Sequence, residues 1–432
     1  MFKLLKKLWR DRRGNALAIA GAALPLIIGS AGLASDTIQW ALMKRQLQRT
    51  ADSAALAGVY GKMSSQAVST GTCSTANSQP VYRDVYTQSN ANTRLDTTVS
   101  CTVGTPASPW NGSGYQAVQV TVSAQRAMAF SGFFLSTAPT ITASATAAVV
   151  QSGKYCVIAL KNNSGTGISF SGNPTVNLGC GLKSNAKGGT SVDATGSPSI
   201  TASPVAAVGK ITGTAEFPAG TTFQPYSAPQ TDPFGSVTAP AVPNGCNQGA
   251  LRGSATTVTV TGTAASPAVV CYSTLKLTSG NVASFTDAVI ILNGGDLDIG
   301  AQSTLNCTRC TFVLTSSDGT APGGITINGG ATVNMSPPTT GTYANLVIYK
   351  DRRATNTCNN CNKINGNSSS TISGGIYVPT QEVQFDGSGS MNTACVQLVA
   401  WQVTFTGNAS ISNTCPSGGP HAFDGTMVRL VA

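Results

Sequence analysis

The feature that most limits what this chain can fold into is an uninterrupted apolar run near its N-terminus. Residues 15–35, NALAIAGAALPLIIGSAGLAS, form 21 residues without a charged side chain. At 1.5 Å per residue, a helix of this length covers roughly 30 Å, the thickness of the hydrocarbon core of a bilayer. Pro25 and the three glycines of the run would weaken a soluble helix, but membrane helices tolerate them. The sequence therefore predicts a transmembrane helix at 15–35.

The segment before this run is basic. Half of the formal net charge of +10 comes from the first 13 residues, where Lys3, Lys6, Lys7, Arg10, Arg12 and Arg13, less Asp11, give +5. Basic residues stay on the cytoplasmic side of a membrane helix, which predicts a cytoplasmic tail at 1–14 and everything after residue 36 outside the cytoplasm. No other dense Lys/Arg cluster with interleaved aromatic residues exists, so no nucleic-acid partner is expected.

The apolar run also has a competing interpretation as a cleaved signal peptide. Gly32-Leu33-Ala34 has the small-x-small pattern of a cleavage site. However, the run is longer than the usual 7–15 apolar residues, and the helical pattern continues past the supposed cut. We expect a retained anchor.

The chain from Asp36 to about Gln66 contains no proline and is rich in helix formers. One stripe at helical spacing narrows from large to small side chains: Trp40, Met43, Leu47, Ala51, Ala54, Ala55 and Gly58. Small residues let another backbone approach closely. The stripe can pack on the chain's own domain or against other subunits. Joined to the span, it predicts a helix of about 50 residues, some 75 Å long.

Two strand patterns follow this helix, at 115–130 and 139–150, with the aromatic stretch SGFFLS between them as a turn or short helix. A long helix followed by a small sheet predicts a pilin-like α+β domain at 36–150.

After residue 150 the sequence consists of irregular repeats. Only 10% of the residues are charged, against about 25% in average soluble domains, while Gly, Ser and Thr are abundant. Glycine-led motifs such as SGNPTVN (171–177), TGSPSIT (195–201) and TGNASIS (406–412) recur at 20–25 residues. That period predicts a mainly β chain whose residues 151–432 form a right-handed parallel β-helix, although the proline-rich region 203–270 fits no repeat.

The twelve cysteines all follow residue 72, as expected in an oxidising compartment. Several spacings match one coil, and equivalent positions in stacked coils lie near 5 Å apart, within reach of a disulfide. The predicted pairs are Cys73–Cys101, Cys156–Cys180, Cys246–Cys271, Cys307–Cys310, Cys358–Cys361 and Cys395–Cys415. The two CxxC pairs have a zinc site or redox chemistry as alternatives, but the residues between them exceed the spacing of common zinc modules.

Candidate catalytic groups are few. Asp296 and Asp298 alternate on one strand and could bind calcium or cleave a glycosidic bond, but a solvated strand face is the favoured interpretation. The cluster Asp351-Arg352-Arg353 fits an ion-pair group at a coil edge better than a lyase base. His421 is the only histidine, which largely excludes histidine triads and multi-histidine metal sites. We expect no enzyme, no cofactor, no metal and no catalytic residue.

The segment RRGNALAIAGAALPLIIGSAGLASDTIQWALMKRQLQRTADSAALAG (12–58), of about 50 residues, resembles the conserved N-terminal domain of the TadG/TadE-like proteins of Flp (tight adherence, Tad) pilus assembly. The resemblance lies in Arg13-Gly14, Pro25, Gly29, Gly32, Asp36, Leu47-Gln48 and the run Ala51-Asp52-Ser53-Ala54-Ala55-Leu56-Ala57. The stretches YANLVIYKDRRA, ISGGIYVPT and CVQLVA more loosely resemble β-helical C-terminal portions of some members.

This resemblance implies a single-pass protein of the bacterial inner membrane, with its C-terminal domain periplasmic or on the cell surface. Its partners would be other Flp/Tad proteins or minor pilins, contacted through the N-terminal helix by the small residues of the motif. Prepilin-type Flp proteins are cut after a glycine and carry glutamate at the fifth position beyond it. Here Ile19 stands five residues after Gly14, which favours an accessory, minor or tip-like role in assembly and adhesion over a major pilin.

Two other functions compete with this one. An anchored β-helical polysaccharide lyase or hydrolase requires carboxylates and a basic residue in one groove of the folded helix. A glycan-binding adhesin, free after signal-peptide removal, requires the loss of residues 1–34.

Overall fold

The computed structural model describes residues 13–73, 79–91, 98–110, 116–242, 246, 248–253, 257–317, 322–354, 362–365, 370–386, 390–413 and 422–431. The chain divides into two compact units, one made of residues 1–150 and 428–432 and the other of residues 151–427. The chain is 47% strand, with one long apolar N-terminal helix and a β-solenoid of about 9 turns. The expected mainly β fold with an N-terminal helix and a β-helix is therefore confirmed, while its right-handedness stays a prediction.

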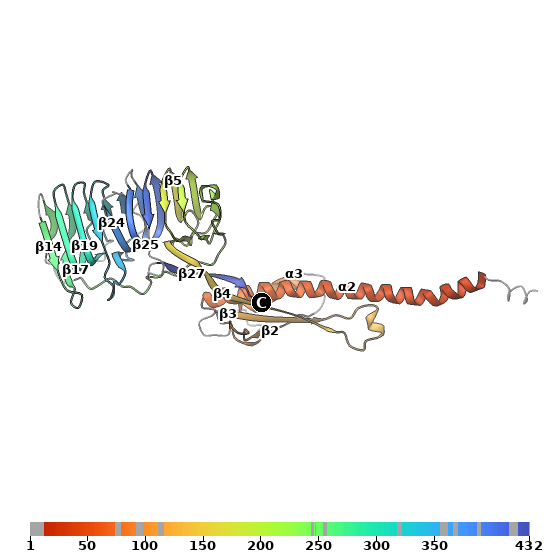
Figure 1. Ribbon diagram of the computed structural model, residues 1–432. Helices are drawn as coiled ribbons and strands as arrows, with labels where there is room; N and C mark the ends of the chain where they lie inside the picture. Colours follow the sequence, from red (N-terminus) through yellow and green to blue (C-terminus); the bar gives the residue numbers. More distant parts are fainter. Residues whose placement is uncertain are drawn as a thin grey trace, which may run out of the picture. The chain divides into compact units, whose positions relative to one another are not determined.

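The first unit is built on a single helix, α2 (Arg13–Met63), of 51 residues that contains Pro25. A second helix, α3 (Pro80–Ala91), packs beside it. The strands β1 (Gly71–Thr72), β2 (Ser100–Gly104), β3 (Ala117–Gln125) and β4 (Thr140–Ala159) pair antiparallel in that order within this unit. Figure 1 shows the β3–β4 hairpin running along α2, with the short 3₁₀ helix η2 (Ser131–Phe133) at its tip.

The second unit is the solenoid, in which three ladders of parallel strands enclose an apolar core. The first ladder stacks β15 (Ala268–Tyr272), β17 (Val282–Asn293), β19 (Thr304–Thr315), β22 (Leu346–Lys350), β24 (Thr371–Asp386), β25 (Ser390–Gly407), the end of β4, β7 (Gly181–Ser184), β10 (Val205–Ala207) and β12 (Phe223–Gln224). The side chains that these strands direct into the core are mostly Val, Ile, Leu and Phe. This explains why charged residues are rare in this region.

The other two ladders use the remaining strands. The second stacks β14 (Thr257–Thr261), β17, β19, β21 (Thr332–Met335), β24, β25, β26 (Ser410–Asn413), β6 (Thr175–Asn177) and β9 (Ser199–Thr201). The third stacks β13 (Ala250–Gly253), β16 (Thr274–Leu277), β18 (Leu297–Ile299), β20 (Ile325–Ile327), β23 (Asn362–Asn365), β24, β25, β5 (Ile168–Gly172), β8 (Val192–Gly196) and β11 (Ile211–Thr212). The short 3₁₀ helix η3 (Thr214–Glu216) follows β11.

The coils do not stack in the order of the sequence. The unit begins in the middle of the stack, winds to one end at β12, and resumes at the opposite end with β13 and β14. It then winds back until β25 pairs with β4 and β5, as the colours of the solenoid in Figure 1 show by passing from green through blue to yellow. At this junction the rings of Phe385, Phe405 and Phe170 stack in the core, with successive centroids 5.4 and 4.9 Å apart.

The return from one end of the stack to the other is made by residues 225–242, which we call the strap. It lies over the outward-facing side of the first ladder, where a second apolar cluster includes Phe234 of the strap and Tyr349 and Tyr377 of the ladder. Tyr377 Oη donates to Asp232 Oδ2 over 2.6 Å, and Arg352 Nη1 donates to Val237 O over 2.9 Å. The proline-rich region that fits no repeat is thus explained in part by this strap.

The strap also shifts the ionisation of the tyrosines beneath it. Burial raises the pKa of Tyr377, and the Asp232 carboxylate that accepts its hydrogen bond raises that pKa further. Burial likewise raises the pKa of Tyr343, whose hydroxyl donates to Thr238 O over 3.0 Å. These tyrosines stay protonated donors and hold the strap to the ladder.

The expected strand boundaries need two corrections. The strand expected at 115–130 ends at Gln125 in β3, because the chain turns away toward η2. The strand expected at 139–150 continues to Ala159 as β4, because its second half joins the first solenoid ladder.

Candidate functional site: the helix–hairpin packing surface

The C-terminal half of α2 packs its narrow stripe into the core of the first unit. Leu47, Ala51, Ala54, Ala55 and Val59 are each 0% exposed and contact valines and alanines of β2, β3, β4 and α3. Side chains this small bring the helix axis close to the sheet. The stripe is therefore the inner face of a folded domain.

Glycine makes the closest approach possible. A Cβ at Gly58 would lie 2.8 Å from Val118 Cγ1 of β3 and 2.8 Å from Val81 Cγ2 of α3. Non-bonded carbon atoms do not approach this closely, so a larger residue at Gly58 would push β3 and α3 away from the helix.

The expectation that the LQRTADSAALAG helix packs closely with sister subunits is wrong for this face. The chain's own sheet and α3 already cover it. The physical reason is that the sheet formed by β1 to β4 has an apolar face that needs a cover, and the narrow helix stripe supplies one within the same chain. Contacts with other proteins are left to the remaining faces of α2.

Polar residues on α2 fix the register of the hairpin. Lys62 Nζ donates to Ala117 O at the start of β3 over 2.8 Å, and Gln48 Nε2 donates to Ser144 O of β4 over 2.9 Å. One turn earlier, Lys44 Nζ donates to Thr142 O. Since each bond reaches a backbone carbonyl, the hairpin is held along the helix regardless of its side chains.

Asp36 ends this series at the tip of the hairpin. Its Oδ2 accepts the backbone N–H groups of Phe130, over 3.1 Å, and Ser131, over 2.6 Å, and the residue is 1% exposed. One turn before it, Gly32 faces the Phe130 ring, and a Cβ there would lie 2.2 Å from Phe130 Cδ1. An acidic residue and a glycine one turn apart thus form a seat for residues 130–131.

The N-terminal half of α2 is different, because it is apolar and exposed. Leu26, Ile27 and Leu33 are 76%, 64% and 57% exposed. An 18-residue window of the helix has a mean hydropathy of 1.4 with 11% of it buried, and this is the one helix in the described part of the chain that is long and apolar enough to cross a membrane. The segment is a candidate membrane span by length and composition.

The residues of the sequence motif fall on different parts of this surface. Leu47, Ala51, Ala54 and Ala55 are buried in the core, and Leu56 packs against it half-buried. Gln48 Nε2 also donates to Asp52 Oδ1 over 2.9 Å, which orients it toward β4. Pro25 lies exposed within α2, and Gly14 lies in its first turn. Asp36 and Gln48 are motif residues whose contacts with the hairpin the sequence did not reveal.

The carboxylates considered for catalysis are engaged in local contacts. Asp298 on β18 pairs with Lys276 of the neighbouring strand over 2.6 Å, and Asp296 Oδ1 accepts the Gly324 N–H over 2.6 Å. Asp351, just after β22, pairs with Arg353 over 2.7 Å; burial raises the pKa of its carboxyl group, but the hydrogen bonds from Arg353 and Thr315 outweigh burial and leave that pKa lowered. Across the described ranges, no group of three or more His, Cys, Asp or Glu residues could hold a metal ion.

Four of the expected disulfides are present: Cys73–Cys101, Cys156–Cys180, Cys246–Cys271 and Cys307–Cys310. The second and third join adjacent coils, whereas the fourth lies within β19. The pair Cys358–Cys361 lies outside the described residues, as do Cys415 of the pair Cys395–Cys415 and the single histidine, His421.

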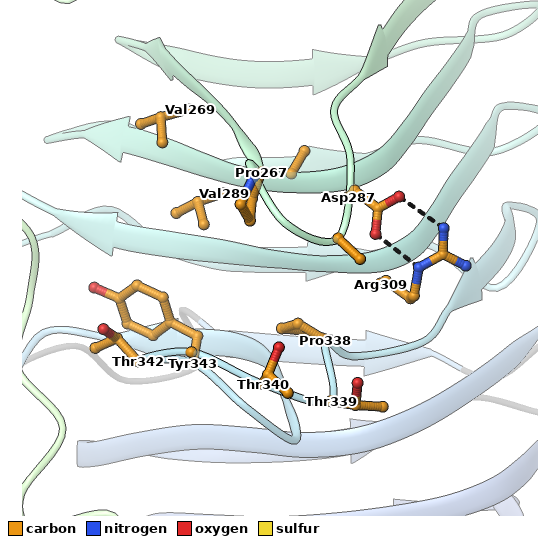
Figure 2. A pocket seen from close by; sticks show the side chains of 13 residues that line it. Pro267, Val269, Asp287, Val289, Arg309, Pro338, Thr339, Thr340, Thr342 and Tyr343 are labelled. Carbon is orange, nitrogen blue, oxygen red and sulfur yellow. Dashed lines mark hydrogen bonds and ion pairs between the residues drawn. The ribbon is translucent and has the colours of Figure 1, made fainter.

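A shallow pocket on the solenoid encloses about 250 Å³ (Figure 2). Its floor is apolar, with Val269 and Val289, and threonines of the loop 338–343 line one side. Arg309 Nε and Nη2 donate to the two carboxylate oxygens of Asp287 over 2.7 Å each, which lowers the pKa of Asp287. The ion pair therefore engages both oxygens of the Asp287 carboxylate.

Comparison with known proteins identifies one domain in the chain. Residues 14–63 match the model of the family described as putative Flp pilus-assembly TadE/G-like, so they form a Tad-type domain. The match covers α2 alone, from its first turn to its last residue. No curated protein and no solved structure matches the chain.

Proposed function

Because α2 is a TadE/G-like domain, and thereby associates the chain with Flp/Tad pilus assembly, we propose that the protein is a membrane-anchored accessory component of that assembly. It takes a minor or tip-like role, with its N-terminus in the cytoplasm of a bacterial cell and both folded units outside the inner membrane. The carrying observation is the division of α2 into an exposed apolar half and a half packed into a domain.

The retained anchor is supported by the continuity of the helix. α2 runs without a break through Gly32-Leu33-Ala34, and Asp36 bonds to the hairpin directly after the candidate cleavage site. Intact-mass analysis of the protein from native membranes should find residues 1–34 present, and alkaline carbonate should leave the protein in the membrane pellet. A mature chain beginning at Ser35 would favour the free adhesin.

The role in assembly is tested by deleting the gene in its native host. Surface filaments are counted by electron microscopy in the deletion strain and in a strain complemented with the wild-type gene. Filaments should vanish or shorten and return on complementation. Persistent filaments with reduced adherence would make the solenoid a binding head, and no change in either would remove the chain from pilus assembly.

The solenoid is proposed to be a structural or adhesive head and not an enzyme. The engagement of Asp296, Asp298 and Asp351 in ion pairs and backbone contacts supports this view. Purified protein incubated with envelope polysaccharide should release no new reducing ends or unsaturated products. Products that appear with the wild-type protein and disappear with Asp298→Asn would establish the lyase or hydrolase alternative.

A further inference from the structure

The tip of the β3–β4 hairpin carries an exposed apolar cluster that the core does not use. Phe133 and Phe134 are 85% and 84% exposed, and the adjacent Leu135 is 46% exposed. Two neighbouring phenylalanines this open to water are unusual for a folded domain. They lie in a stretch, residues 127–153, that contains no Asp, Glu, Lys or Arg.

The position of this tip is fixed by the contacts of α2. Going toward the N-terminus of α2, Gln48, Lys44 and Asp36 contact β4 at Ser144, then Thr142, then the tip at Ser131. The hairpin therefore runs toward the apolar half of the helix. Its last contact, Phe130 on Gly32, falls inside the candidate span 15–35, about 5 Å short of its outer end.

From these contacts we propose that the tip of the β3–β4 hairpin, Phe133, Phe134 and Leu135, inserts into the lipid surface beside the outer end of the transmembrane helix. The proposal rests on the membrane anchor proposed above, and the occupant is the acyl-chain and headgroup boundary of the bilayer. Phe and Leu side chains of segments that lie at a membrane surface are buried at this boundary, where the free energy of binding comes from the apolar area removed from water.

The burial of Asp36 fits the same arrangement. A carboxylate at the end of a membrane span is costly unless its charge is satisfied. Here the two N–H groups of Phe130 and Ser131 satisfy it, and in doing so they hold the apolar tip at that depth. A second point of insertion would fix the tilt and rotation of the first unit on the membrane.

The test uses the full-length protein reconstituted in vesicles of phosphatidylethanolamine and phosphatidylglycerol that carry bromine on the acyl chains, which quenches nearby tryptophan. Phe134→Trp is the reporter, with Phe133→Trp as a second one. Tyr86→Trp is the matched control, because Tyr86 is 57% exposed on α3 of the same unit. The emission of the wild-type protein, with its four tryptophans, is subtracted.

Insertion predicts that the added emission of Phe134→Trp shifts to the blue and is quenched at least about twofold more than that of Tyr86→Trp, most strongly by bromines within about 10 Å of the headgroups. Equal quenching of the two would overturn the proposal. A blue shift without quenching would also overturn it, because a second copy or a pilus protein would then cover the tip. If the wild-type protein is extracted by carbonate, the anchor itself fails; if it stays anchored and Phe134→Trp is unquenched, only the present inference fails.

Discussion

At the scale of single residues, Asp36 marks the end of the candidate membrane span and also holds the tip of the β3–β4 hairpin. Its carboxylate is buried where the candidate membrane span ends, and it binds two backbone N–H groups of a segment more than 90 residues later in the chain. Hydrogen bonds to a charged acceptor are worth about 1.5–3 kcal/mol. The residue is thus a tertiary clamp between α2 and the hairpin.

Replacement of Asp36 by alanine should loosen the hairpin tip without unfolding the sheet. The Ser131 amide should lose at least about tenfold in hydrogen-exchange protection, since a factor of ten corresponds to about 1.4 kcal/mol. Asp36→Asn keeps an acceptor and should lose less. Amide exchange measured by mass spectrometry on a peptide covering 127–136 checks this, and unchanged protection in Asp36→Ala would show that the clamp is not needed.

Lys183 is a residue whose ionisation should affect the solenoid. It is 1% exposed on β7, its Nζ donates to Ser227 Oγ over 2.6 Å, and burial lowers its pKa from 10.5 to about 8. Between these two values the unfolded chain binds more protons than the folded one. The free energy of unfolding should therefore rise as the pH is raised from about 8 to about 10.5.

Lys183→Met should make this rise shallower, because methionine cannot titrate and fills a similar volume. The exposed Lys210, replaced by methionine, is the matched control. Denaturant unfolding followed at several pH values gives the result. Lys350, buried on β22 with its pKa lowered to about 7, adds a rise of its own, so Lys183→Met should keep that part of the rise while Lys210→Met keeps all of it. If the free energy of unfolding depended on pH in the same way in the wild type and in Lys183→Met, a lowered pKa of Lys183 would be contradicted.

At the scale of elements, the contact between β25 and β5 closes the solenoid. Phe405, 1% exposed, lies between the rings of Phe170 and Phe385. Removing a buried phenylalanine from a packed core costs about 3–5 kcal/mol.

Phe405→Ala should lower the stability of the solenoid by that amount, about 3–5 kcal/mol, whereas Tyr226→Ala, at a site that is 70% exposed, should change it little. Denaturant unfolding of the full-length protein under oxidising conditions measures both. A similar small effect for the two variants would mean that the junction contributes little to the stability of the stack.

The elements also show how far the sequence could lead. The long helix follows from its apolar run and its stripe, and the solenoid follows from glycine-led motifs one coil apart. The pairs Cys156–Cys180 and Cys246–Cys271 could be placed because each spacing equals one coil. These signals lie within one segment or recur at a fixed period, so both kinds can be recognised from the sequence alone.

Other features have no local signal. Asp36 carries no mark of the distant segment that it binds, and the strap is a proline-rich stretch whose partners Tyr377 and Arg352 lie more than 110 residues away. A signal for α3 was present, since Pro80 at its first position and Val81 and Val85 one turn apart are typical of a short amphipathic helix. The stripe on α2 was open to two interpretations, because small residues suit packing on a sheet and packing on another helix.

At the scale of the whole molecule, the order of the coils decides where the solenoid opens. Its two ends are β12 with β11, and β14 with β13, while the coil that begins the unit lies inside the stack. End strands lack a partner on one side and should exchange their amide hydrogens first. Strand β14, whose residues are half-buried or exposed, should be among the fastest.

Hydrogen exchange of the intact protein should therefore rank strands by their position in the stack and not by their position in the sequence. The amides of β5 and β25 should be as protected from exchange as those of β17 and β19, although β5 and β25 lie near the two ends of the unit in the sequence. Exchange that is fastest in β5 and β25 would show that the stack opens at its junction.

The same coil order has a consequence for synthesis. Strand β5 must wait for partners made 235 residues later, as the bond between Ser169 and Thr404 shows. While it is being synthesised, the chain therefore holds two half-stacks, each with an open edge that can capture other strands. Neither edge is covered before residues 390–413 have emerged. A chain that stops short of that last coil would keep both edges unpaired and would therefore be prone to aggregation.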